Sequence, residues 1–396
     1  MSASPRTWLG RTLGSRNPHI DFLRGLAVLV VMYTHFGVCA PFSKSLLLGA
    51  NLSAKLSRNG YYGVSVFFVV SGFVITSTSL RRFGTLRQVR VGEFYVFRVS
   101  RLLFPLLVLV ALNVGCLQAG VPAFQMTAGI SLPRLLASVF TLRFNLLYLH
   151  GGALLQPWAP LWSLAIEEVF YLMFPWLGRI FRRAWAWGLL LGLCVSFGPF
   201  YRAWIGPDAG YLYPGCFDGL ALGCLTAWVA ARWRTPLAHQ ALGPSLRVLG
   251  LAGLAVVYFS ADVRVAPAAI FGPPLMGAAA TVYLLGSVGA PEPSPLFQHF
   301  LPTVLLAGAV ELMGYLSYEL YLFHLPAFLL ATPGWQRLAR ALGGFFPRDL
   351  AFVASAGVLT LVSLGLSRGL HEPARRYFRA LLSRGARADL SSPRSH

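Results

Sequence analysis

The sequence predicts an all-α fold, a polytopic bundle of about ten transmembrane helices with both termini in the cytoplasm. Hydrophobic residues make up 56% of the chain, charged residues only 12%, and the mean hydropathy is +0.63. This composition excludes an ordinary soluble globule. The net charge of +20 does not predict nucleic acid as a partner, because the arginines form short clusters between apolar runs.

The apolar runs are long enough to cross a bilayer, at about 17 to 25 residues each. In chain order the predicted spans are 20–38, 62–80, 102–120, 160–178, 184–200, 211–231, 247–260, 267–289, 312–332 and 350–367. The first follows an arginine-rich start and so resembles a signal peptide. It carries His35 and no clear A-x-A site follows, so we expect an uncleaved span. We expect a membrane domain over 1–378 and a basic cytoplasmic tail over 379–396, with Ala290–Pro295 as the one linker-like stretch.

The basic residues predict which ends of the spans face the cytoplasm. With the amino terminus inside, most of the 33 Lys and Arg fall on the cytoplasmic side, as the positive-inside rule requires. The residues predicted to face the cytoplasm are Arg6, Arg11, Arg16, Arg81, Arg82, Arg87, Arg90, Arg98, Arg101, Arg179, Arg182, Arg183, Arg232, Arg234 and the arginine-rich tail from Arg368.

The first span carries an arginine and a histidine, Arg24 and His35, on one helix face. They are 11 positions apart, almost three whole turns, which places them roughly 16 Å apart along the axis. Ionisable groups in a span are costly, so this pair is a functional-site hypothesis. A permanent cation at one end and a base that titrates near neutrality at the other suit a charged donor with a reactive tip.

Other spans carry polar residues that the topology places at similar depths, in the middle-to-outer part of the bilayer. Such groups must face one another or a wet cavity. The predicted layer contains His35, Ser71, Gly72, Glu167, Glu168, Asp218 and His324. At the inner boundary we expect Arg24, Arg98 and Arg101 to gather with the cluster Arg81–Arg90 and to bind phosphates.

This layout matches the needs of an acyl-CoA enzyme in a membrane. The nucleotide stays at the arginines while the pantetheine arm reaches the deeper layer. There a histidine held by a carboxylate takes the proton of an acceptor hydroxyl as it attacks the thioester. The sequence thus predicts acyl transfer by general base catalysis.

Each residue also has a plainer interpretation. Arg24 suits a snorkelling anchor, Arg98 and Arg101 plain cytoplasmic charges, and His35 a helix-packing hydrogen bond. Asp218 suits a packing brace, and His324, followed by Leu325–Pro326, suits a kink. Gly72 suits a close helix contact, and Tyr315, Tyr318 and Tyr321 suit packing or a wet cavity wall. The five cysteines show no CxxC spacing, so neither a metal site nor a disulfide is expected.

Five stretches, in order, resemble the acyltransferase 3 family of membrane acyltransferases. They are DFLRGLAVLVVMYTHF (Asp21–Phe36), GVSVFFVVSGFVIT (Gly63–Thr76), FRVSRLLFP (Phe97–Pro105), LWSLAIEEVFYLMFP (Leu161–Pro175) and YLSYELYLFHLP (Tyr315–Pro326). The resemblance implies a bundle of about ten helices in a bacterial cytoplasmic (inner) membrane. It also implies transfer of an acyl group, often acetyl, from coenzyme A to a hydroxyl of a sugar, glycolipid, polysaccharide or macrolide.

The family's motifs fall on particular residues here. The arginine-x10-histidine motif falls on Arg24 and His35, and the arginine-x-x-arginine motif on Arg98 and Arg101. The serine-glycine-phenylalanine motif falls on Ser71–Phe73, and the Trp-Ser-Leu plus acidic motif on Trp162–Leu164 with Glu167 and Glu168. Some members end in a periplasmic hydrolase-like domain; this chain stops at His396, so we expect no transfer through such a domain unless a separate protein supplies it. The common Asp-Gly before the first arginine reads Asp21-Phe22-Leu23, which we take as harmless.

The predicted roles follow from both lines of reasoning. His35, Glu167 and Glu168 are predicted to be catalytic. The donor, acetyl-CoA or another acyl-CoA, is assigned to Arg24, Ser71, Gly72, Arg98 and Arg101. A carbohydrate or glycolipid acceptor is assigned to Trp162, Asp218, Tyr318 and His324. Membrane lipids are the other expected partner, and no metal is expected.

Two functions of other classes compete. A transporter would use the intramembrane histidines and carboxylates to relay protons, but no internal repeat is evident. A degenerate scaffold protein would not need Arg24, His35 and the glutamates.

Overall fold

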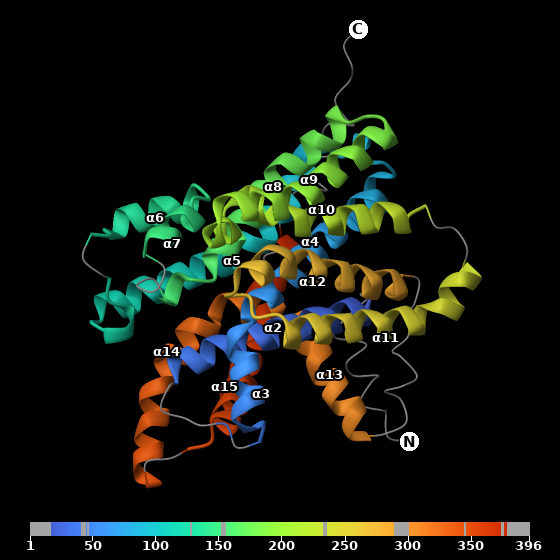
Figure 1. Cartoon of the computed structure of the whole chain (residues 1–396). Helices are drawn as coiled ribbons and strands as arrows, with labels where there is room; N and C mark the ends of the chain where they lie inside the picture. Colours follow the sequence, from blue (N-terminus) through green and yellow to red (C-terminus); the bar gives the residue numbers. More distant parts are fainter. Residues whose placement is uncertain are drawn as a thin grey trace.

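The computed structural model describes residues 17–40, 45, 47–126, 129–151, 156–232, 236–288, 301–343, 346–373 and 376–377. Throughout these residues the regular structure is helical (Figure 1), which confirms the predicted all-α class. The longer helices are α2 (Pro18–Cys39), α4 (Gly60–Phe83), α5 (Val91–Gln118), α8 (Leu161–Ile180), α9 (Ala184–Ile205), α10 (Tyr213–Ala230), α11 (Pro236–Ser260), α12 (Ala266–Ser287), α13 (Leu301–Tyr315), α14 (Ser317–Ala341) and α15 (Arg348–Leu366). The shorter ones are α3 (Gly49–Arg58), η1 (Leu86–Gln88), η2 (Pro122–Phe124), α6 (Leu132–Phe140), α7 (Phe144–Gly151), η4 (Gln156–Trp158), η5 (Pro207–Tyr211) and the π-helical turn η7 (Ser367–His371).

Seven helical segments within the described residues are long and apolar enough to cross a membrane. They are Pro18–Cys39, Gly60–Phe83, Val91–Gln118, Ala184–Ile205, Leu242–Ser260, Ala266–Ser287 and Arg348–Leu370. The predicted spans 160–178, 211–231 and 312–332 also fall on helices, but those are not among the seven. The chain is a multi-pass membrane protein, while the number of spans and the side of each terminus stay predictions. The predicted linker Ala290–Pro295, the tail 379–396, Arg6, Arg11, Arg16 and Arg234 lie outside the described residues.

Helix α4 lies at the centre of the bundle, in contact with α2, α10 and α12. Its closest neighbour is α10, and the two helices meet at glycines. A Cβ at Gly72 would overlap the carbonyl oxygen of Leu220, and one at Gly223 would overlap that of Val69. Small residues at such crossings let helix backbones touch, which is how membrane helices gain packing contacts.

The predicted span 312–332 is wrong as a single helix, because the chain breaks at Leu316. Helix α13 ends at Tyr315 and α14 begins at Ser317. The reason lies in packing: α13 crosses α2 so closely that a Cβ on Gly314 would overlap the backbone carbonyl of Asp21, and one on Gly25 would overlap that of Val310. Helix α14 then turns along a different part of α2, and this turn carries its side chains to the site described below.

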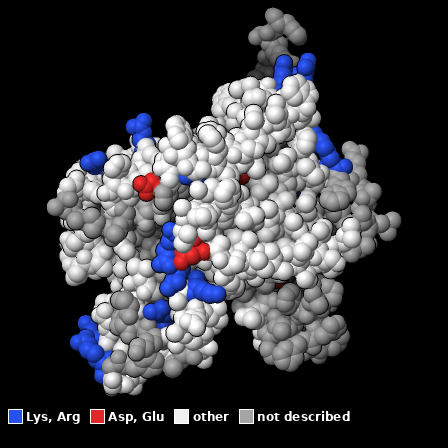
Figure 2. Space-filling view, in the orientation of Figure 1, with Lys and Arg blue, Asp and Glu red and all other residues white. Residues whose placement is uncertain are grey.

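The outer helices carry apolar side chains on their exposed faces. On α9, Leu189, Leu193 and Phe200 are exposed, and on α15 the same holds for Val353 and Leu361. Figure 2 shows a mostly uncharged surface, with charged side chains in one column down this face and others at its edges. Apolar surface of this extent is what lipid covers.

Candidate functional site

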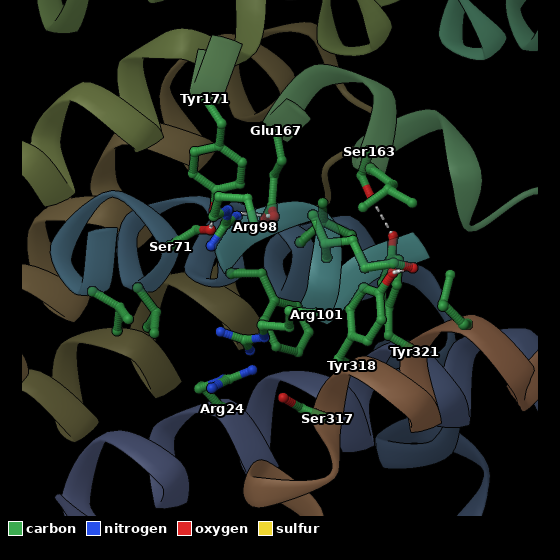
Figure 3. Close-up of a pocket in the computed structure, with 17 residues that line it drawn as sticks. Arg24, Ser71, Arg98, Arg101, Ser163, Glu167, Tyr171, Ser317, Tyr318 and Tyr321 are labelled. Carbon is green, nitrogen blue, oxygen red and sulfur yellow. Dashed lines mark hydrogen bonds between the residues drawn. The ribbon is translucent and has the colours of Figure 1, made fainter. Parts of the chain in front are cut away.

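A small polar cavity, here called the chamber, lies between α2, α4, α5, α8 and α14 (Figure 3). Its volume is about 80 Å³. The polar residues that line it are Arg24, Ser71, Arg98, Arg101, Ser163, Glu167, Tyr171, Ser317, Tyr318 and Tyr321. Sequence reasoning predicted Arg24, Ser71, Arg98, Arg101, Glu167 and Tyr318 as site residues, and the structure brings all six together.

Arg98 lies over an aromatic ring and beside a carboxylate. Its guanidinium carbon is 3.5 Å from the centre of the Tyr171 ring, and Nη2 is 3.7 Å from Oε1 of Glu168. The hydroxyl of Tyr171 donates to Glu167 Oε2 at 3.3 Å, and because its single proton is used there, Ser71 Oγ donates to the phenol oxygen. Glu167 and Tyr171 are four residues apart, so they share one face of α8.

This arrangement corrects the predicted separation of arginines and carboxylates into two layers. Arg98 lies in the same cavity as Glu167 and pairs with Glu168. The prediction assumed that each arginine stays at the membrane boundary, but an arginine that finds carboxylates and an aromatic face within the bundle is compensated there.

A larger cavity, here called the vestibule, adjoins the chamber and has a volume of about 1170 Å³. Val74, Arg24 and Arg101 line both cavities, so the two share a wall. The arginines that line the vestibule are Arg24, Arg81, Arg87, Arg101, Arg182 and Arg232. The predicted gathering of Arg24 and Arg101 with the cluster Arg81–Arg90 is thus present in part: Arg82 and Arg90 instead pair with Glu93.

Two histidines of the bundle, His35 of α2 and His324 of α14, contact each other. His324 Nε2 is 3.1 Å from His35 Nδ1, and the same Nδ1 is 3.0 Å from the carbonyl oxygen of Val31. The predicted partner of His35 was a carboxylate, which is wrong: the turn at Leu316 brings α14 to this part of α2, whereas the glutamates of α8 face Arg98. The ring of Tyr321, which lines the chamber, lies 5.9 Å from that of His324, so the histidines lie behind the chamber wall.

Besides His35, His324 and Glu168, three further predicted site residues do not line the chamber. Gly72 forms the crossing of α4 and α10. Trp162 stacks parallel to Tyr61, with 5.9 Å between ring centres. Asp218 is buried and pairs with Arg202 of α9 at 2.6 Å. Gly72 and Asp218 therefore have the packing roles that the plainer interpretation gave them.

Sequence reasoning missed two residues that organise these sites. Tyr171 looked like one more aromatic residue of an apolar helix, although its position one turn after Glu167 was a usable signal. Arg202 lies beyond the predicted span 184–200, whereas α9 continues to Ile205, so the partner of Asp218 went unrecognised.

No cluster of three His, Cys, Asp or Glu in the described part of the chain is arranged to hold a metal ion. The fold and the cavities define a membrane-embedded helical protein with a basic vestibule that adjoins a polar chamber. The family model described as an acyltransferase domain matches residues 17–368. The chain belongs to this family, acyltransferase 3, as the five sequence stretches predicted.

Two curated relatives show the level of similarity. The peptidoglycan O-acetyltransferase OatA of Listeria monocytogenes is 26% identical over 364 residues, which cover 85% of this chain and 54% of the relative. The O-acetyltransferase OatA of Staphylococcus aureus is 27% identical over 329 residues, 78% of this chain and 50% of the relative. This chain therefore spans about half the length of these relatives. No solved structure matches it with significance.

Proposed function

We propose that this protein is an integral membrane O-acyltransferase that moves an acyl group, above all acetyl, from acyl-CoA to a hydroxyl of a carbohydrate-type acceptor. The observation that carries the proposal is that the arginine-lined vestibule adjoins the chamber, with Arg24 and Arg101 in the walls of both. Tyr321, which lines the chamber, contacts His324, and His324 in turn contacts His35. Membership of the acyltransferase 3 family supports acyl transfer as the reaction.

The vestibule suits the nucleotide end of the donor. Coenzyme A carries a diphosphate and a third phosphate, and guanidinium groups bind phosphates through paired hydrogen bonds. Arg81, Arg87, Arg182 and Arg232 come from different helices and loops around one open cavity, so they can meet phosphates from several sides. The narrow pantetheine arm would continue past Arg24 into the chamber.

His35 is the proposed base. An acceptor hydroxyl attacks the thioester carbonyl carbon, its proton passes to the imidazole, and the carbon–sulfur bond breaks to release the CoA thiolate, which takes the proton. The products are an ester and CoA. Glu167 and Glu168 lie against Arg98 and Tyr171 and not against His35, so we assign them to holding Arg98 at the donor.

The acceptor is proposed to be a glycan hydroxyl, since the relatives are named for O-acetylation and one of them for peptidoglycan. The arginine clusters orient the vestibule towards the cytoplasm of a bacterial inner membrane, by the positive-inside rule. Trp162 and Tyr318, with their aromatic neighbours, remain our proposed acceptor contacts. The transporter alternative has no support from the family match, which is to acyltransferases.

The test is transfer of radiolabelled acetyl from acetyl-CoA to peptidoglycan glycan oligomers, in vesicles that contain the protein. We expect turnover in the wild type and a loss of about 10²–10⁴-fold in His35→Ala, the usual contribution of a general base. His150→Ala is the matched control, because Nδ1 of that exposed histidine of α7 likewise bonds the carbonyl oxygen one helical turn earlier, that of Leu146. Transfer that survives in His35→Ala, or solute uptake without CoA, would contradict the proposal.

A further inference from the structure

The hydrogen bonds of His35 and His324 determine where the protons of both rings lie. A carbonyl oxygen only accepts hydrogen bonds, so a ring nitrogen bonded to one must carry a proton. His324 Nδ1 is 2.8 Å from the carbonyl oxygen of Tyr321, and His35 Nδ1 is 3.0 Å from that of Val31. Both rings therefore carry their proton on Nδ1.

The contact between the rings is then a donor meeting an acceptor. In the Nδ1-protonated ring of His324, Nε2 has a lone pair, and it lies 3.1 Å from the protonated Nδ1 of His35. The Nδ1 proton of His35 is shared between Val31 and His324. A proton on Nε2 of His324 would face the Nδ1 proton of His35 across this distance, so the geometry excludes the doubly protonated form of His324.

Burial separates the roles of the two rings. His324 is fully buried, and both of its nitrogens are engaged. His35 is partly exposed, and within the described residues no hydrogen bond engages its Nε2. Only Nε2 of His35 retains an unused lone pair.

We propose that His324 is a positioning residue that holds His35 in the Nδ1-protonated tautomer and so makes Nε2 the atom that removes the proton. This inference rests on the proposed function. As the hydroxyl oxygen bonds to the thioester carbon, its proton moves to Nε2 of His35. The resulting imidazolium keeps its Nδ1 proton directed at the lone pair of His324. When the carbon–sulfur bond breaks, the Nε2 proton passes to the CoA sulfur.

Two substitutions of His324 separate this role from packing. In His324→Gln the side-chain amide oxygen reaches the place of Nε2 and still accepts from His35. In His324→Asn the shorter amide reaches only the place of Nδ1, so it bonds Tyr321 and leaves the carbonyl oxygen of Val31 as the one remaining acceptor described for Nδ1 of His35. We expect His324→Gln to keep kcat within about tenfold of the wild type and His324→Asn to lose about 10²-fold or more. The KM for acetyl-CoA is expected to stay unchanged in both.

A packing role alone would lower kcat and thermal stability alike in the two variants, and that result would overturn the inference. Wild-type kcat in His324→Asn would overturn it too. Activity that survives in His35→Ala would instead contradict the proposed function. If His324→Asn does not fold, nitrogen NMR of histidine-labelled wild type decides, with the His35 signal assigned by its absence in His35→Gln. A proton on Nδ1 that also shows a coupling across the hydrogen bond to Nε2 of His324 supports the inference, and a proton on Nε2, or an Nδ1 proton without that coupling, overturns it.

Discussion

Two of the ion pairs inside the helix bundle differ in how completely their atoms are used. In the first, Arg202 of α9 meets Asp218 of α10 at 2.6 Å, and only 3% and 6% of the two side chains are exposed. Arg202 also donates to the carbonyl oxygens of Gly215 and Ile270, and Asp218 Oδ1 accepts from the backbone of Gly219. We call this pair closed, because each nitrogen of the guanidinium and each oxygen of the carboxylate has a hydrogen-bond partner.

We call the second pair, Arg98 with Glu168, open, because some of its polar atoms have no hydrogen-bond partner among the described residues. The two groups are 3.7 Å apart, and 17% and 18% of their side chains are exposed. In the part of the chain that the structure describes, Arg98 Nε and Glu168 Oε1 have no hydrogen-bond partner. The guanidinium lies against the Tyr171 ring at the edge of a cavity.

The difference teaches how to separate scaffold from site among buried charges. Burying a charge is costly, so a pair that serves only the fold is expected to use every donor and acceptor. A pair that keeps unused atoms beside a cavity has hydrogen-bonding capacity for a ligand. Sequence reasoning placed Asp218 and the two glutamates in one polar layer of the site, and the contacts now separate Asp218, which braces the fold, from the glutamates beside Arg98.

The largest expected effect comes from breaking the closed pair. In Asp218→Asn the shape is kept, but the Arg202 charge is left without a counter-charge inside the bundle. We expect the free energy of unfolding to fall by about 3–5 kcal/mol. The measurement is unfolding by SDS in mixed micelles, with CoA binding followed on the protein that stays folded.

Adding Arg202→Met to Asp218→Asn is the control, because it removes the unpaired charge and is expected to restore part of the stability. Unchanged stability with weaker CoA binding in the single variant would reverse the assignment of the two pairs.

The second effect concerns the open pair. We expect Arg98→Gln to weaken CoA binding by about 10- to 100-fold, or about 1.4–2.8 kcal/mol, because it removes a charged hydrogen-bond donor from the chamber that is proposed to take the pantetheine arm. Stability is expected to fall by less than in Asp218→Asn, because both side chains of the open pair are partly exposed and water can reach the glutamate left behind. Isothermal titration with CoA and SDS unfolding measure the two quantities.

Arg264→Gln is the matched control, an arginine substitution far from the vestibule in the connection between α11 and α12. His35→Ala gives the complementary result: turnover is lost while CoA binding stays nearly intact. Equal losses of CoA binding in Arg98→Gln and His35→Ala would contradict the separation of donor site and base.

A smaller effect tests what holds the open pair in place. Tyr171→Phe keeps the ring beneath Arg98 but removes the hydroxyl that bonds Glu167 and Ser71. We expect CoA binding to weaken by about 0.5–1.5 kcal/mol, the usual value of one hydrogen bond. Tyr171→Leu also removes the ring and is expected to cost about 0.5–2 kcal/mol more. Indistinguishable binding by all three proteins in titrations would show that Arg98 needs no support from Tyr171.

The fold could be predicted where the signal is local. Apolar length and arginine clusters identify helices such as 20–38 and 62–80, because each helix must satisfy its own backbone in lipid. The break at Leu316 could not be predicted in this way, since 312–332 is one apolar run. It depends on the contact of Gly314 with α2, a tertiary property.

The site follows the same division. Arg24, Arg98 and Glu167 stand out because ionisable residues are rare in spans. Their partners do not stand out: His324 follows His35 by 289 positions, and the partner of Asp218 lies beyond a predicted helix end. The sequence thus identifies which residues are polar, and the packing of α14 and α9 decides which of them meet.

The smallest effect comes from a third ion pair, which lies in water and sets the lower end of the comparison. Asp262, between α11 and α12, pairs with Arg264 at 2.6 Å, and the bond from Arg264 lowers the pKa of Asp262 from 3.8 to about 2. A carboxylate with a lowered pKa stabilises the fold above its unfolded pKa, and that contribution is lost as the pH falls from 3.8 through about 2. Solvent screens this exposed pair, so we expect Asp262→Asn to leave the Tm almost unchanged at pH 7 and at pH 5. Thermal unfolding in detergent at pH 7, 5 and 3 measures the Tm. A loss of Tm as large as that of Asp218→Asn would show that burial does not determine how much these ion pairs stabilise the fold.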